Sequence, residues 1–220
     1  MRRNIYCKEL EKIVYTSGES YNHFKRQEEG EAENLEELQA RQVKCVAVSP
    51  DGLHIATGDM FGYLHVYDME SGEQIKEILA HDQEVVCLDY APFKIAGQGY
   101  LLASGSRDRL IHIFKSENDY EDINHLEDHT SSIVALKFAY HAAERDPNKR
   151  LKIISSGADK TIIYRNIDCN MTITLYHKEG FKNNKIVSMD VLGSRVVAGH
   201  DRLITVADMA YKARVFEKRP

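Results

Sequence analysis

Residues 101–112 read Leu-Leu-Ala-Ser-Gly-Ser-Arg-Asp-Arg-Leu-Ile-His, and this stretch decides the fold. An apolar run ends in small residues, and a turn around Asp108 leads into a second run, in which Ile111 and Ile113 alternate with His112. Two short runs with a period of two, separated by a turn, are typical of antiparallel strands and too short for a helix. The stretch therefore predicts a β-hairpin.

The pattern of this hairpin recurs four times along the chain. Each unit has a first apolar run, a second run that ends in small or polar residues, a turn, a third run and a fourth, outer run. The turn position holds Phe61, Asp108, Asp159 and Asp201, which lie 47, 51 and 42 residues apart. Spacings of this size are the signature of a repeat architecture. The predicted runs are Val43–Val48, His54–Gly58, Tyr63–Tyr67 and Gln74–Leu79; Val85–Tyr90, Leu101–Ser106, Leu110–Phe114 and Asp122–Leu126; Ile133–Phe138, Lys152–Gly157, Thr161–Arg165 and Thr172–Tyr176; and Ile186–Val191, Arg195–Gly199, Leu203–Ala207 and Lys212–Phe216.

Three regions differ in composition. Residues 43–220 carry the four repeats and predict an all-β fold built from four-stranded units. Residues 16–42 hold seven acidic and three basic side chains, and their second half offers only Leu35 and Leu38 as apolar anchors, which indicates an acidic linker or a marginal helix. Residues 1–15 are predicted to form the outer strand of a preceding unit.

The composition argues against several functional classes. The 220 residues are 43% hydrophobic and 29% charged, as in a globular protein, and no window approaches the roughly 18 apolar residues of a transmembrane helix. The net charge of −5, without a basic stripe, argues against binding to nucleic acid or to an anionic membrane. The first residues lack the apolar run of a secretory signal and the four cysteines are widely spaced, so we expect a reduced, cytoplasmic protein.

Candidate metal and catalytic groups are better explained by the repeats. His125 and His129 lie four residues apart with Glu127 between them, but a helical zinc motif needs the glutamate directly after the first histidine. Sets of serine, histidine and aspartate that look like a hydrolase triad recur in successive repeats, whereas a catalytic set is usually unique. We therefore expect no enzyme activity, no metal and no cofactor.

The ends of the runs resemble those of WD repeats, which build β-propellers. In that family a Gly-His step and a Trp-Asp step mark each repeat, and an aspartate occupies a tight turn between them. This chain has no tryptophan, so the second step is always degraded. The first step is represented by Ala80-His81 and Asp128-His129, and the second by Tyr67-Asp68, Phe114-Lys115, Arg165-Asn166 and Ala207-Asp208.

The resemblance also implies a buried hydrogen-bond network in each blade of the propeller. In the family this network joins the histidine of the Gly-His step, a strand Ser or Thr, the turn Asp and the Trp. The first blade keeps Thr57 but has Phe61 at the turn, and the fourth blade has Val197 in place of the Ser. The second and third blades offer three members each for a structural network, namely His81, Ser104 and Asp108, and His129, Ser155 and Asp159.

A narrower resemblance covers nearly the whole chain. The continuous string from 80 to 165, above all the stretches 81–90, 101–112 and 156–162, resembles the mitogen-activated protein kinase-binding WD-repeat proteins. Members of that group are described as scaffolds for c-Jun N-terminal kinase signalling and as centrosome or spindle-pole proteins. The resemblance implies a non-catalytic protein-interaction scaffold that organises kinase signalling, or alternatively a structural component of a cytoskeletal, centrosomal or ciliary assembly.

Four blades predict an open or incomplete propeller. Closed propellers have about 4–8 blades, and the edges of a sheet must be paired or covered. We therefore expect an open four-blade arc with two exposed flanks, as in a fragment of the propeller region of a longer protein.

Residues that do not repeat are the candidates for partner binding, because the repeated apolar runs are needed for packing between blades. Arg107 and Arg109 flank the Asp108 turn and can bind carboxylates, and Phe61 can serve as an apolar anchor. In the alternative interpretation both arginines are solvated turn residues and Phe61 packs inward. The insertion 141–150 adds further basic candidates.

Overall fold

The computed structural model describes residues 42–95, 99–140, 151–181, 184–201, 203–209 and 213–218. The predicted strand at 1–15 and the predicted acidic linker, apart from Gln42, lie outside the described residues, as does the insertion 141–150.

The described residues form sixteen strands in four sheets, and every sheet is an antiparallel meander of four strands that are consecutive in the chain. This all-β architecture confirms the fold class predicted from the sequence. One 3-10 turn, η1 (Ser116–Asn118), joins β7 to β8. Blade 1 contains β1 (Val43–Val48), β2 (His54–Asp59), β3 (Tyr63–Asp68) and β4 (Gln74–Leu79); blade 2 contains β5 (Val85–Tyr90), β6 (Leu101–Ser106), β7 (Ile111–Lys115) and β8 (Glu121–Leu126); blade 3 contains β9 (Ile133–Tyr140), β10 (Leu151–Gly157), β11 (Thr161–Ile167) and β12 (Ile173–Gly180); blade 4 contains β13 (Ile186–Leu192), β14 (Arg195–His200), β15 (Ile204–Asp208) and β16 (Ala213–Lys218).

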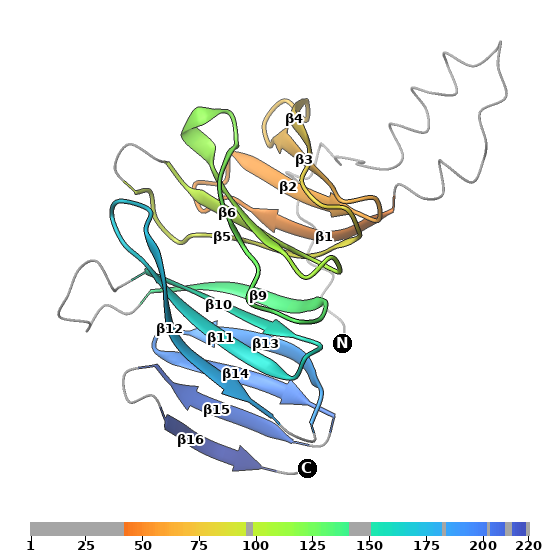
Figure 1. The fold of residues 1–220 in the computed structure, drawn as a ribbon. Coiled ribbons are helices and arrows are strands. Elements are labelled where there is room, and N and C mark those ends of the chain that lie inside the picture. Colours follow the sequence, from red (N-terminus) through yellow and green to blue (C-terminus); the bar gives the residue numbers. More distant parts are fainter. Residues whose placement is uncertain are drawn as a thin grey trace, which may run out of the picture.

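The four blades lie side by side in chain order, from blade 1 at one end to blade 4 at the other (Figure 1). Their first strands pack against one another in the order β1, β5, β9 and β13, and they form the inner edge of the arc. Among the described strands the sheets do not close into a ring, so the fold is an open segment of a propeller.

Apolar side chains repeat at the same positions of each blade, and they form the core between neighbouring blades. The cluster between two blades takes three residues from the second and third strands of one blade and further residues from the inner strand of the next. These sets are Ala56, Leu64 and Val66 against Val85, Leu88 and Tyr90; Ala103, Ile111 and Ile113 against Ile133, Leu136 and Phe138; and Ile154, Ile162 and Tyr164 against Ile186 and Met189.

The two ends of each blade differ in what they carry. The turns between the second and third strands lie at the same end as the connections from one blade to the next; we call this end the turn face. At Gly62 of the turn face φ is +92°, and a Cβ atom would lie 2.0 Å from the carbonyl oxygen of His81. Only glycine therefore allows the blade-1 turn to pack this closely on the connection into blade 2.

Candidate functional site

In blade 2 the turn face is held by a buried network of three side chains. His81 lies in the connection after β4, and its Nδ1 atom is 2.9 Å from Oδ2 of Asp108 in the turn after β6. The opposite ring atom, Nε2, is 2.8 Å from Oγ of Ser104, which is fully buried in β6. Because a carboxylate only accepts hydrogen bonds, Nδ1 donates to Asp108, and Ser104 donates to Nε2 of the neutral ring.

Backbone amides complete the coordination of Asp108. The amide of Leu110 donates to Oδ1 at 2.9 Å, and the amide of Asp82 donates to Oδ2 at 3.2 Å. Burial opposes ionisation of the carboxyl, but the hydrogen bonds from His81 and these amides outweigh it and lower the pKa of Asp108 below its ordinary value. Asp108 thus ties the connection between two blades to the turn of the second.

Blade 3 repeats this arrangement. His129 Nδ1 lies 3.0 Å from Asp159 Oδ2, and His129 Nε2 lies 2.9 Å from Ser155 Oγ. Thr161 adds two hydrogen bonds to Asp159, from its amide at 3.0 Å and from its hydroxyl at 2.7 Å. Burial lowers the pKa of His129, although the neighbouring Asp159 opposes this, so the neutral imidazole is the form that the fold holds.

Arg165 takes the position at which the family has tryptophan. Its side chain is almost completely buried, and Nη1 donates to Ser155 Oγ at 3.0 Å. Nε and Nη2 of the same guanidinium donate to Asp128 Oδ2 at 2.9 and 2.6 Å. Burial lowers the pKa of Arg165, and the carboxylate of Asp128 opposes this shift. Arg165 thus stands in place of the tryptophan of the repeat, and its partner Asp128 stands in place of the glycine of the Gly-His step. Comparison of single positions in the sequence did not reveal that these two substitutions form a pair.

In blade 1 an aspartate at a different position accepts the hydrogen bonds of the turn. Phe61 does occupy the turn position, but Asp59, two residues earlier, accepts hydrogen bonds from the amides of Phe61 and Tyr63, both at 2.9 Å. Its other oxygen is 3.3 Å from Nε2 of His65 on β3. Thr57, which stands where blades 2 and 3 have serine, is buried. An aspartate whose side chain accepts hydrogen bonds from amides two and four residues later is a common turn signal. The position of Asp59 could therefore have been recognised in the sequence.

In blade 4 the prediction that Val197 replaces the network serine is wrong. The pairing of β13 with β14 places Ala198 opposite Met189, as Ser104 lies opposite Leu88 in blade 2. The turn between β14 and β15 is one residue shorter than in the other blades, because Gly199 pairs with Ile204 whereas Gly105 pairs with Ile111. The alignment by turn position was therefore displaced by one residue.

The three candidate binding residues lie on the turn face. Phe61 is 46% exposed, so it does not pack fully inward. The Phe61 turn contacts the connection 81–83, and the Arg107 side chain, 63% exposed, forms an ion pair with Glu84 at 2.6 Å from Nε. Arg109 is exposed with φ of +80°, and its Nε donates to the carbonyl of Asp108 at 3.3 Å. Phe61 and the two arginines therefore flank one connection on the same end of the arc.

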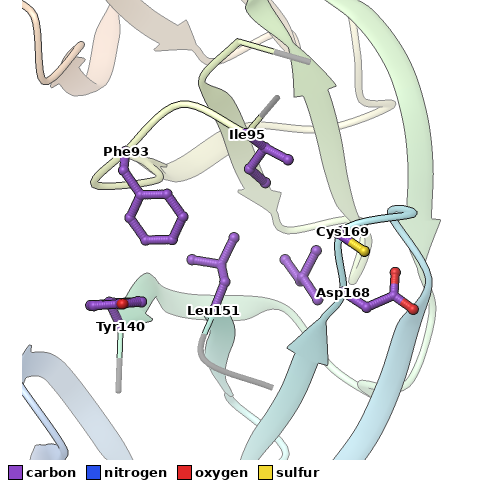
Figure 2. Close-up of a pocket in the computed structure, with 7 residues that line it drawn as sticks. Phe93, Ile95, Tyr140, Leu151, Asp168 and Cys169 are labelled. Carbon is purple, nitrogen blue, oxygen red and sulfur yellow. The ribbon is translucent and has the colours of Figure 1, made fainter. Parts of the chain in front are cut away.

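The opposite end holds a cavity of about 210 Å³ between blades 2 and 3. Figure 2 shows the rings of Phe93 and Tyr140 on one side of it and Asp168 and Cys169 on the other. The two rings meet edge to face with centroids 4.9 Å apart, and Leu151 forms part of the wall. The lining is mainly apolar and contains no arrangement of groups that resembles a catalytic set.

Two other kinds of site are absent from the described part of the chain. No group of three or more His, Cys, Asp or Glu side chains there is arranged to hold a metal ion. None of the helices among those same residues has the length and hydrophobicity needed to cross a membrane.

Comparison with known proteins agrees with the repeat pattern. The family model of the WD domain, G-beta repeat, matches residues 33–68 and 72–115. WD repeat-containing protein 62 of Mus musculus is 37% identical over 169 residues, and mitogen-activated protein kinase-binding protein 1 of Homo sapiens is 36% identical over 167 residues. The chain carries WD repeats. These two alignments cover 74% and 75% of this WD-repeat chain, which spans only 10% of the length of each relative.

Other similarities are more distant. Nuclear distribution protein PAC1 of Gibberella zeae is 32% identical over 54% of this WD-repeat chain and 25% of its own length. Among solved structures, a chain of the mitotic checkpoint complex matches with a TM-score of 0.65 at 22% identity, and the RRP9 WD40 repeats match with 0.65 at 18%. The matches cover 80% and 81% of this chain but 51% and 49% of those propeller chains, which agrees with an open segment.

Proposed function

We propose that this WD-repeat chain is a non-catalytic scaffold that binds a partner protein through the turn face, at Phe61, Arg107 and Arg109. WD repeats and relatives named for kinase binding or nuclear distribution support an interaction role in general. The observation that carries the specific proposal is that buried structural residues and exposed candidate binding residues lie together on the turn face. The residues that recur between blades 2 and 3 are buried in hydrogen-bond networks, whereas all three candidates are exposed. Phe61 and Arg107 have no counterpart of the same type in the next blade, and Arg109 has a basic counterpart in Lys160.

The chemistry of the three residues suits an acidic segment that carries an apolar side chain. The Nε atom of Arg107 contacts Glu84, and the side chain as a whole is 63% exposed. Among the described contacts, Arg109 donates only to the neighbouring carbonyl of Asp108. Both can therefore form charge-assisted hydrogen bonds with carboxylates. Phe61 and Met60, which are 46% and 40% exposed, provide an apolar anchor beside them.

A mitogen-activated protein kinase is the partner class that we propose. Support comes from the similarity to human mitogen-activated protein kinase-binding protein 1. The second candidate is a cytoskeletal, centrosomal or ciliary assembly, which the similarity to nuclear distribution protein PAC1 favours. Under either proposal the chain acts in the cytoplasm, in the second case at the cytoskeleton or centrosome.

Binding of purified kinase and of purified tubulin to the immobilised chain tests the proposal. The double variant Arg107→Glu/Arg109→Glu should weaken binding of the true partner by about 1–3 kcal/mol, which is about fivefold to 150-fold in Kd, without lowering the melting temperature. Lys160→Glu is the matched control, because Lys160 is exposed, has φ of +65° and occupies the position of Arg109 in blade 3. It should bind as the wild type does.

The outcomes separate the candidates. Binding of kinase that depends on the two arginines supports the first candidate, and the same dependence for tubulin supports the second. If the double variant binds with wild-type affinity, or if Lys160→Glu weakens binding equally, the turn of blade 2 is not the docking site.

A further inference from the structure

We propose that Glu84 is a positioning residue, which holds the guanidinium of Arg107 in place for a carboxylate of the partner, whereas Arg109 contributes its charge alone. This inference rests on the proposed docking at the turn face, and it adds the way in which each arginine recognises an acidic segment. It follows from the different surroundings of the two arginines.

Arg107 is anchored twice to one residue of the connection into blade 2. Its amide donates to the carbonyl oxygen of Glu84 at 3.0 Å, and its Nε atom lies 2.6 Å from Oε2 of the Glu84 carboxylate. The Glu84 side chain is only 17% exposed, and Nζ of Lys44, on β1, lies 3.8 Å from its other oxygen. Glu84 is therefore a largely buried anion that lies between two cations from neighbouring blades.

The fold needs the backbone part of this contact but not the ion pair. The same hydrogen bond between an amide and a carbonyl recurs at the equivalent positions of blades 3 and 4, with lengths of 2.8 and 3.2 Å. Strand pairing shows that these positions hold Ser132 and Ala158 in blade 3 and Lys185 and Asp201 in blade 4. Serine and alanine form no ion pair, and in blade 4 the order of the charges is reversed. Blade 3 thus makes the same backbone contact without the side chains that blade 2 adds to it.

The ion pair restricts the Arg107 side chain and leaves most of its donors for a partner. Among the described contacts this side chain uses only Nε, and it is 63% exposed as a whole. Because a guanidinium is planar and rigid, a contact at Nε also restricts the directions of the remaining N–H groups. Such a fork can form two parallel hydrogen bonds with one carboxylate, and less conformational entropy is lost than with an unrestrained arginine.

Arg109 has a weaker anchor among the contacts that the structure describes. Its Nε atom donates at 3.3 Å to the carbonyl of Asp108, which is a neutral acceptor one residue away. The equivalent position of blade 3 holds Lys160, with φ of +65° where Arg109 has +80°. A lysine therefore fits this backbone conformation as an arginine does. Arg109 supplies a positive charge without a fixed direction.

Substitutions that conserve charge separate the two roles. The assay is binding of the immobilised chain to purified kinase or purified tubulin, whichever of the two it captures. Arg107→Lys should weaken binding about tenfold, because a lysine ammonium cannot form the two parallel hydrogen bonds of a guanidinium. Arg109→Lys is the matched comparison, and it should bind within about twofold of the wild type because it keeps the charge.

Two neutral variants at position 84 isolate the positioning role. Glu84→Gln keeps an oxygen that can accept from Nε of Arg107, whereas Glu84→Ser introduces the short side chain of blade 3. Both variants remove the same charge, so a difference between them does not arise from repulsion of the partner. Glu84→Ser should bind about twofold to tenfold more weakly than Glu84→Gln, which is the cost of ordering one long side chain on binding. In an Arg107→Ala background the two variants should bind equally.

Melting temperatures show whether the variants keep the fold. Glu84→Ser and Arg107→Ala introduce the residues that blade 3 already has at these positions, Ser132 and Ala158. Both should therefore melt close to the wild type. A loss of binding by a variant with the wild-type melting temperature is then a property of the docking site.

The outcomes distinguish this inference from the proposed function. If Glu84→Gln and Glu84→Ser bind equally while Arg107→Glu/Arg109→Glu weakens binding, the turn face is the docking site but Glu84 does not position Arg107. If Arg109→Lys weakens binding as much as Arg107→Lys, the two arginines act alike and the inference is wrong. If neither partner binds, or if binding is independent of both arginines, the proposed docking site fails and the inference fails with it.

Discussion

Removal of the Asp108 carboxylate tests whether the blade-2 network is structural. Asp108→Ala deletes the acceptor of the His81 ring, of the Asp82 amide and of the Leu110 amide. The His81 side chain is fully buried and the Asp108 side chain is 7% exposed, so the ring loses its partner where water cannot replace it. A buried donor left without an acceptor costs about 1–3 kcal/mol, and the two amides at the exposed turn add less, so we expect a loss of about 2–3 kcal/mol.

Urea denaturation and thermal melting measure this loss. For a domain of this length each kcal/mol lowers the melting temperature by about 2–4 °C, so the expected decrease is about 4–12 °C. Asp122→Ala is the control, because Asp122 also contacts a histidine, His112, at 2.6 Å, but its side chain is 41% exposed. An exposed pair of this kind contributes about 0–1 kcal/mol.

The pH dependence of the stability difference between wild type and Asp108→Ala provides a second check. Because the pKa of Asp108 is lowered in the folded protein, its stabilisation is complete above the ordinary aspartate pKa of about 3.9. It is lost as the pH falls through the lower pKa of the folded state, so wild type and Asp108→Ala should converge in acid. Equal stability of Asp108→Ala and wild type at neutral pH, combined with loss of partner binding, would refute the reasoning and make Asp108 a binding residue.

Three further predictions concern other buried groups. Because burial lowers the pKa of His129, the unfolded chain takes up a proton first, and stability should decline as the pH falls through the ordinary histidine pKa of about 6.5. In His129→Gln the urea midpoint should depend less on pH, and an unchanged slope would assign the decline to other groups. Arg165→Met should lower the free energy of unfolding, measured by urea denaturation, by about 2–3 kcal/mol. Arg165→Lys should lower it nearly as much, because a lysine ammonium lacks the planar guanidinium that reaches both Ser155 and Asp128, and wild-type stability of the lysine variant would contradict this. Alkylation followed by mass spectrometry should label exposed Cys169 in the folded chain well before half-buried Cys87, whose pKa is raised by desolvation. Equal rates would contradict this difference in accessibility and pKa.

The strand pattern was predictable because it depends on local signals. The hairpin predicted from residues 101–112 is present as β6 and β7, and the other predicted runs agree with the strands within a few residues. Alternating apolar residues bounded by turn residues specify a half-buried strand without reference to the rest of the chain. The packing of one blade on the next then follows, because the same strand positions are apolar in each blade.

The details of the networks depend on contacts between distant segments and were not predictable position by position. Arg165 reaches Asp128, 37 residues away, and the two substitutions make sense only as a pair. The register of blade 4 depends on a turn shortened by one residue, which is why Val197 was placed one position too early. Asp59 was missed because it caps the blade-1 turn from outside the repeated turn position.

The claim that partners bind at the turn face is tested most directly by hydrogen–deuterium exchange with and without the bound kinase. Residues 60–62 and 107–110 carry the exposed candidates, whereas residues 93–95 and 167–169 surround the cavity at the opposite end. We expect the partner to slow exchange in the first pair of segments and to leave the second pair unchanged. Protection around the cavity with none at the turns of blades 1 and 2 would contradict the account.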